Sequence, residues 1–244
     1  MATAPDMSGP GLLFVMARIS RKDIMDEPTY MNWYDNDHIA EIIETSGFDS
    51  AFRFIRKDRD TASFPYLALY PMDDVAFLKS EEFKKIRVHS KLLPGSGLVY
   101  DLADNEVRYY GLKEVVDGTK KGKGHTKTIV PAQFELKEGS SEAEFETWVK
   151  EKARGYLRTT KFKLLFARTN AQSRALKGLP TTDEPSPEPP TWLVFHEFEL
   201  DDVDAGVVEK ANSDAEGGGL FGFSDLPVYC IAKTHGQGDF FHGR

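Results

Sequence analysis

The stretch YMNWYDNDHI, residues 30–39, decides how this chain folds, because it reads as a helix with a histidine on its apolar side. At about 100° per residue, His38 falls between Tyr34 and Ile42 and beside Met31. An imidazole on an inward helical stripe titrates near neutral pH and needs a hydrogen-bond partner. His38 is therefore either a satisfied core histidine or a working acid and base.

Length and charge narrow the class of protein. The 244 residues, 40% of them hydrophobic, suit one large or two small domains with a proper core. A net charge of −8 disfavours a nucleic-acid partner, and a single cysteine excludes an intrachain disulfide. The apolar run at residues 11–17 is too short for a signal segment or a membrane span. We therefore expect a cytoplasmic protein with neither a membrane nor a nucleic-acid partner.

The first half of the chain predicts the order βαββαβ from its periodicity. A charged turn between two aromatic, β-rich runs indicates a hairpin, and Pro94 and Gly95 end the second helix. The expected strands are residues 12–19, 48–57, 64–70 and 106–115, and the expected helices are residues 27–46 and 73–93.

The second half repeats the same order after a loop rich in glycine and lysine. Ser141 and Glu144 have the spacing of a capping box, and a proline-rich insertion at residues 179–190 reads as a surface loop. The expected strands are residues 127–136, 161–168, 191–200 and 227–234, and the expected helices are residues 141–157 and 201–211. The predicted units are residues 1–116 and 125–244, with residues 117–124 as the linker.

Two such units would each leave one sheet face bare, and packing these faces together buries both. The tandem order, the W-Y-x-x-x-H-I helix of residues 33–39 and a late helix ending in His89 resemble the dimeric α/β-barrel superfamily, nearest its EthD-like and polyketide-cyclase-like groups. The resemblance implies an α+β fold of two tandem ferredoxin-like βαββαβ units, packed sheet to sheet as a dimeric α/β barrel within one chain. A homodimer of such pseudo-dimers is a further expectation.

The two halves differ at the histidine. When the two halves are aligned so that Trp33 matches Trp148, His38 aligns with Ala153. One interpretation is that the first half keeps a site and the second is its degenerate structural partner. Drift in a purely structural pair would leave the same pattern.

Four residues are candidate catalytic groups. His89 lies at the edge of an apolar stripe beside Ile86 and Leu93, and the resemblance implies that it is a general base. The alternative is an exposed histidine attracted to the end of a helix dipole. The full candidate set is His38, His89, Tyr34 and Asp35.

Other side chains have the chemistry to hold a substrate. Arg18 and Arg53 can clamp a carboxylate or enolate, although a salt bridge to Asp35 or Asp37 is the commoner use of such an arginine. Tyrosines can donate to an oxyanion, but at these spacings they also suit a core. The candidate substrate-binding residues are Tyr30, Trp33, Arg18, Arg53 and Tyr109.

The resemblance implies a cofactor-independent lyase, cyclase or isomerase that acts on a hydrophobic aromatic or polyketide-derived small molecule through histidine acid/base chemistry. One alternative is a cofactor-free, anthrone-type monooxygenase. Another is a non-catalytic binding or stress-response barrel without a pocket of ligand size. We expect no cofactor and no metal site, since His235, Asp239 and His242 match a metal-ligand spacing only loosely.

Overall fold

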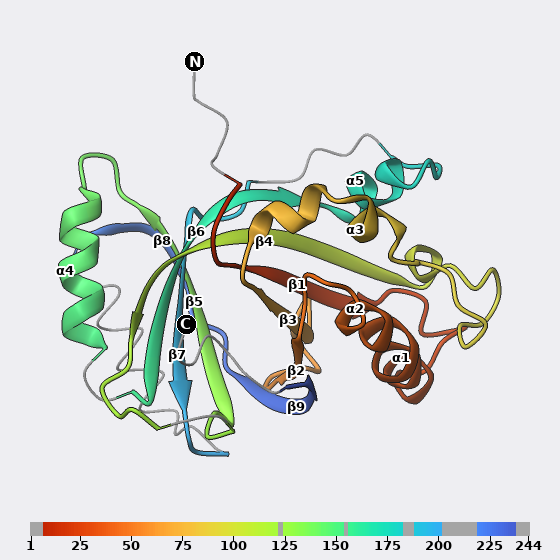
Figure 1. Cartoon of the computed structure of the whole chain (residues 1–244), viewed down its shortest axis with the longest axis horizontal. Helices are drawn as coiled ribbons and strands as arrows, with labels where there is room; N and C mark the ends of the chain where they lie inside the picture. Colours follow the sequence, from red (N-terminus) through yellow and green to blue (C-terminus); the bar gives the residue numbers. More distant parts are fainter. Residues whose placement is uncertain (1–6, 122–123, 154–155, 183–187, 202–218, 238–244) are drawn as a thin grey trace.

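The computed structural model is a closed barrel of antiparallel strands with helices on its outside (Figure 1). It describes residues 7–121, 124–153, 156–182, 188–201 and 219–237. Eight strands follow one another in the order β7-β6-β4-β1-β3-β2-β9-β5, and β5 pairs again with β7 to close the ring. A ninth strand, β8, pairs with the part of β5 that β9 leaves free. The strands are β1 (Gly11–Ile19), β2 (Ser50–Arg56), β3 (Tyr66–Met72), β4 (Ala103–Val116), β5 (Thr128–Leu136), β6 (Arg158–Arg168), β7 (Trp192–Phe198), β8 (Phe221–Asp225) and β9 (Tyr229–Gly236).

The helices form two groups on the outside of the barrel. Those of the first half and α5 gather on one side, and α4 covers the other side (Figure 1). The α-helices are α1 (Glu27–Trp33), α2 (Ile39–Ile43), α3 (Glu81–Lys85), α4 (Glu142–Lys152) and α5 (Asn170–Leu176). A π-helical turn (Tyr34–His38) joins α1 to α2, and 3-10 turns lie at Val75–Lys79 and Val99–Asp101. No helix in the described ranges is long and apolar enough to cross a membrane.

Alternation along the strands separates the barrel interior from the outer layers. On β1, Leu12 and Phe14 face a buried interior cluster, and Phe195 of β7 reaches the same cluster. Their neighbour Leu13 faces outward, into the layer beneath the first-half helices. A third cluster lies beneath α4. Because each fully buried large apolar side chain contributes about 1.5–3 kcal/mol, these three layers carry most of the stabilisation.

The two halves of the chain have the same relative strand order. The first half is ordered β4-β1-β3-β2, and the second is ordered β9-β5-β7-β6. The pairs β2–β9 and β4–β6 join the halves and complete the ring. The barrel implied by the sequence is therefore confirmed.

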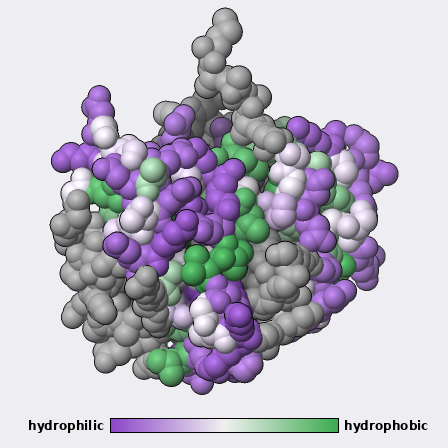
Figure 2. Space-filling view, turned by 60° about the vertical axis from the view of Figure 1, so that its left-hand side comes forward, coloured by the Kyte–Doolittle hydropathy of each residue, from purple (hydrophilic) through white to green (hydrophobic). Residues whose placement is uncertain are grey.

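The surface on the α4 side is mostly polar, with apolar side chains in a small central area (Figure 2).

All eight predicted strands are confirmed, with boundaries that shift by a few residues, and β8 is the strand that the sequence analysis missed. The hairpin of β2 and β3 pairs Phe52 with Leu69, and the predicted capping box forms at the start of α4, where Ser141 and Glu144 bond reciprocally. The helix expected at residues 141–157 is shorter and ends at Lys152. The helix expected at residues 201–211 falls almost entirely outside the described residues.

The helix predicted at residues 73–93 is wrong. Ser80 has an extended backbone, and its hydroxyl accepts a hydrogen bond from the Phe83 N–H at 3.0 Å, so a new helix, α3, starts there and lasts five residues. The chain is then extended, and the Val88 carbonyl accepts from the Val99 N–H at 3.0 Å. β-Branched residues after α3 disfavour a continued helix. His89 consequently lies in an exposed bridge to Leu98 rather than on a helix.

A buried ion pair inside one end of the barrel gives a stability test. Arg158 Nη1 and Glu197 Oε2 are 2.9 Å apart, and both side chains are almost fully buried. Burial raises the pKa of Glu197, and the charge of Arg158 opposes that rise. We expect Arg158→Met to lower the free energy of unfolding by about 3–5 kcal/mol, because the buried Glu197 carboxyl must then either stay charged without its partner or take up a proton. Urea denaturation followed by circular dichroism measures this loss.

The double variant Arg158→Met/Glu197→Gln is the control. It removes both charges, so its loss should be smaller than that of Arg158→Met alone. Equal stability of Arg158→Met and the wild type would contradict the pairing.

Candidate functional site

A cavity of about 320 Å³ lies between the outer face of the first-half sheet and the helices that cover it. Its walls are apolar and aromatic for the most part, a composition typical of small-molecule sites. The second half contributes the end of β6 and α5 to its rim. The side chains that carry the argument below are Trp33, Tyr34, His38, Tyr70, Tyr109, Arg168, Ser173 and Lys177.

His38 reaches this cavity through an irregularity in the helix. The Ile39 N–H donates to the Tyr34 carbonyl, five residues back, which makes the turn π-helical. Such turns insert one extra residue and recur at functional sites. The ring of His38 stacks on Trp33 at 4.9 Å between centroids and meets Tyr34 edge-on at 5.6 Å. The turn therefore presents three adjoining rings to the cavity.

The environment of His38 keeps its imidazole neutral. Burial of the ring lowers the pKa of His38 to about 4, although the charge of Asp37 and a hydrogen bond with the Arg87 backbone oppose the shift. Lys177 and Arg87 add repulsion to the charged form. At physiological pH the ring has a free lone pair and can accept a proton.

Two tyrosines continue the aromatic wall from the sheet. The Tyr70 hydroxyl on β3 donates to the Tyr34 hydroxyl at 3.4 Å, and burial raises the pKa of Tyr34 to about 12. Tyr109 on β4 stacks on Phe166 at 4.0 Å between ring centroids, and its buried hydroxyl has no hydrogen-bond partner among the residues that the structure describes. The Tyr34 phenol therefore remains a protonated donor at neutral pH.

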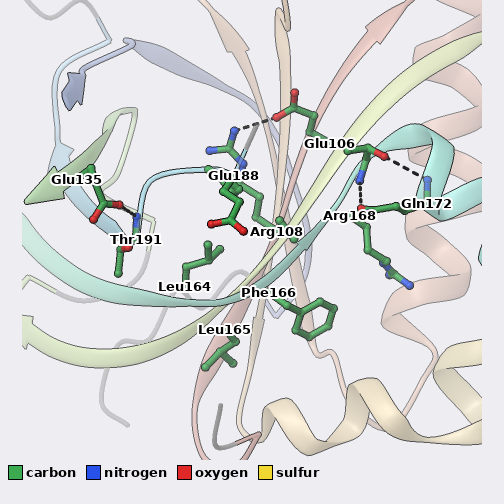
Figure 3. Close-up of a pocket in the computed structure, with 13 residues that line it drawn as sticks. Glu106, Arg108, Glu135, Leu164, Leu165, Phe166, Arg168, Gln172, Glu188 and Thr191 are labelled. Atoms are coloured by element: carbon green, nitrogen blue, oxygen red, sulfur yellow. Dashed lines mark hydrogen bonds and ion pairs between the residues drawn. The ribbon is translucent and has the colours of Figure 1, made fainter. Parts of the chain in front are cut away.

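A β-bulge brings an arginine to the cavity. Tyr109 pairs with Phe166, but Tyr110 pairs with Leu164, so Leu165 is an extra residue on β6. Before the bulge Leu164 faces the barrel interior, whereas Phe166 and Arg168 lie on the outer side, as Figure 3 shows. Bulges commonly redirect a side chain in this way. The Arg168 guanidinium lies 4.9 Å from the centroid of the Tyr109 ring.

Helix α5 contributes a second cation. It begins with a capping box in which Thr169 and Gln172 bond reciprocally. Lys177 follows α5, and its Nζ donates to the Lys84 and Ile86 carbonyls at 2.8 and 3.1 Å. These two hydrogen bonds fix the end of α5 over the cavity. The Thr169 and Gln172 spacing is a readable helix signal that the sequence analysis missed.

Several predicted site residues lie outside the cavity. Arg53 donates two hydrogen bonds to Asp35, at 2.8 and 2.9 Å. It therefore forms the salt bridge that we gave above as the commoner alternative to substrate binding. Arg18 pairs with Asp104 at 2.8 Å on the surface. Tyr30 is buried behind the aromatic wall, against Trp33 and Tyr34, and the exposed His89 does not line the cavity.

Asp35 holds the π-helical turn against the barrel. Besides Arg53 on β2, His235 and Lys233 on β9 lie 3.1 and 3.4 Å from its carboxylate. Burial alone would raise the pKa of Asp35, but the hydrogen bonds and charge of Arg53 lower it. Asp35 is thus an anchor for the turn that carries His38.

A second, larger cavity of about 770 Å³ opens at the mouth of the barrel (Figure 3). Its Arg108 already pairs with Glu106 at 2.8 Å and with Gln133. Glu135 and Glu188 add negative charge to its lining. None of the histidine, cysteine and acidic side chains in the described ranges form a cluster of three that could hold a metal ion.

No family model matches the chain. The core atranone cluster protein 1 of Stachybotrys chlorohalonatus is 34% identical over 74 residues, which cover 30% of this chain. The match spans 31% of that relative, so the chain covers about a third of its length.

Solved structures match over nearly the whole chain. An anthrone oxidase-like protein has a TM-score of 0.52 at 12% identity and covers 100% of this chain and 99% of its own. A candidate monooxygenase from Fusobacterium nucleatum has a TM-score of 0.55 at 11% identity, and the match covers 96% of this chain and 98% of the neighbour. A candidate monooxygenase from Lactobacillus acidophilus has a TM-score of 0.51 at 12% identity, and the match covers 95% of this chain and 98% of the neighbour. These likenesses show a shared fold, a barrel found in monooxygenase-like proteins.

The ion pairs of Arg53 with Asp35 and of Arg18 with Asp104 should differ in their effect on stability. Arg53→Met leaves Asp35 without its main partner in a site where both side chains are about a tenth exposed. We expect the free energy of unfolding to fall by about 3 kcal/mol. Arg18→Met breaks an exposed pair and should cost about 1 kcal/mol or less. Parallel urea titrations compare the two, and equal losses would mean that Asp35 is not an anchor.

Proposed function

We propose that this chain is an oxygen-dependent, monooxygenase-like enzyme that acts on a hydrophobic aromatic or polyketide-derived small molecule in the cavity beside His38. The structural neighbours and the cluster relative support this alternative better than the lyase, cyclase or isomerase chemistry that the sequence analysis placed first. The observation that carries the proposal is a neutral histidine on the wall of an aromatic cavity.

The aromatic walls suit a flat substrate. The stacked rings of Trp33 and His38 lie on one wall, and those of Tyr109 and Phe166 lie on another. Fused aromatic rings bind such surfaces by stacking and edge contacts. Apolar cavities also take up small apolar molecules, a property that suits dioxygen.

His38 would remove a proton from an activated C–H group of the bound substrate. The imidazolium that forms and the carbanion of the substrate then stabilise each other in a site of low dielectric. The cations of Arg168 and Lys177 at the cavity wall add to this stabilisation.

The carbanion is the electron donor for dioxygen. For an anthrone-type CH₂ group, both hydrogens leave and one oxygen atom becomes the new carbonyl. The other oxygen atom leaves with the two hydrogens as water. The four electrons that reduce dioxygen come from the substrate, so we propose that the reaction takes place without a cofactor.

We further propose that residues 1–116 and 125–244 are two copies of one ferredoxin-like unit, joined by residues 117–124. Their matching strand orders support this division. In the second copy, aromatic rings pack beneath α4. The ring centroids of Phe134 and Phe221 are 4.5 Å apart, and those of Phe134 and Trp148 are 5.2 Å apart. The first copy would then be the active one and the second its structural partner.

Oxygen uptake with anthrone as the substrate tests the function. We expect consumption above the enzyme-free rate, with one dioxygen per anthrone and one labelled oxygen atom in the product under ¹⁸O₂. Carbon dioxide released from an aromatic acid without oxygen uptake would favour the lyase. Turnover of neither kind by the wild type would favour a binding protein.

Replacing the two histidines should separate their roles. His38→Ala removes the base, so we expect the rate of oxygen uptake to fall by about 10²–10⁴-fold. His89→Ala should keep the wild-type rate, because His89 is exposed and does not line the cavity. An oxygen electrode measures both variants, and a loss of activity on His89→Ala alone would refute this assignment.

The pH profile follows from the pKa of His38. Its neutral form is the active one, and its pKa in the folded protein is lowered to about 4. We therefore expect kcat/KM to stay level from neutral pH downward and to fall only as the pH drops through about 4. An acid limb near the unperturbed histidine value of about 6.5 would contradict a desolvated base. Circular dichroism at each pH separates this effect from unfolding.

A further inference from the structure

One wall of the cavity carries hydrogen-bond donors that have no acceptor. Tyr109 Oη, Arg168 Nε and Ser173 Oγ are buried, and none makes a hydrogen bond of good geometry within the described residues, although the Ser173 hydroxyl and the Tyr100 phenol are close enough to interact. Tyr109 is fully buried and Ser173 is 3% exposed. The three come from β4, β6 and α5, and all line the same cavity. Because buried polar groups are nearly always paired, such a set indicates a missing ligand.

Arg168 makes this set electropositive. Within the described residues no carboxylate lies at ion-pair distance from its guanidinium, which contacts the face of Tyr109 instead. Burial lowers the pKa of Arg168, and burial together with the charge of Arg168 lowers the pKa of Lys177. Holding two unneutralised cations in a partly desolvated wall is costly, and an anion would offset that cost.

The larger cavity has a more acidic lining. Arg108 there is already satisfied by Glu106 and Gln133, and two further glutamates line the same space. Arg168 borders the larger cavity as well, as Figure 3 shows, but Tyr109 and Ser173 line the smaller cavity and not the larger one, so the donors come together on the wall of the smaller cavity.

We propose that Arg168, with Tyr109 and Ser173, binds an ionised oxygen on the aromatic substrate, so that the natural substrate is an acidic aromatic molecule. The oxygen belongs to a phenolate or to a carboxylate. This inference rests on the proposed function for the choice of an aromatic ligand, but it concerns binding and not the oxidation step. The anionic oxygen occupies the donor wall while the rings stack beside His38.

Inert probes test the inference without turnover. Anthraquinone-2-carboxylate and its neutral carboxamide have the same rings, and both are already oxidised. Calorimetry should show that the wild type binds the carboxylate on the order of tenfold more tightly or better, since hydrogen bonds to charged groups are the stronger ones. Arg168→Gln should abolish this preference, and Arg168→Lys should keep part of it.

Lys163→Gln is the matched control. It removes a positive charge from the same strand, β6, but at a surface site where Lys163 pairs with Glu142. We expect it to bind both probes as the wild type does. A preference that survives in Arg168→Gln, or no preference for either ionised probe in the wild type, would overturn the inference.

A phenolic probe identifies the source of the charge. Bound 2-hydroxyanthraquinone should show its phenolate absorption band below its solution pKa if the wall is built for a phenolate. A carboxylate preference without this band assigns a carboxylate instead. Preference for an ionised probe, lost in Arg168→Gln, supports the anion site even if oxygen uptake is never observed, so the two proposals fail separately. Failure of every probe to bind the wild type would overturn the anion site.

Discussion

Closure of the barrel is the constraint on which the rest of the structure depends. Phe14 on β1 and Phe195 on β7 meet in the interior at 6.2 Å between ring centroids, and either half alone would expose its share of this surface. The pairs β2–β9 and β4–β6 hold the two halves together. Closure also places the end of β6 and part of α5 beside the cavity of the first half. The site is therefore shared between the halves although its histidine comes from one of them.

Two departures from regular backbone create the chemistry of the cavity. A π-helical turn directs His38 into the cavity beside Trp33, and a bulge at Leu165 directs Arg168 out of the barrel and into the same cavity. Asp35 fixes the first of these, through partners on β2 and β9. A base and an anion-binding cation consequently lie on the walls of one small apolar space.

The sequence predicts the fold better than it predicts the site. Alternation and turn signals were enough for the hairpin of β2 and β3 and for the strands that flank it, because these patterns are local. His38 was found because one ionisable group on an apolar stripe is conspicuous. His89 was misplaced, since an apolar spacing compatible with a helix does not reveal that Ser80 interrupts it. Arg168 could not be found, because a one-residue bulge depends on pairing between distant strands.

A crystal structure of the complex with anthraquinone-2-carboxylate tests the central claim most directly. The account predicts the rings in the cavity between the first-half sheet and its helices, next to His38, with the carboxylate on Arg168. A ligand bound in the barrel mouth against Arg108, with His38 untouched, would contradict it.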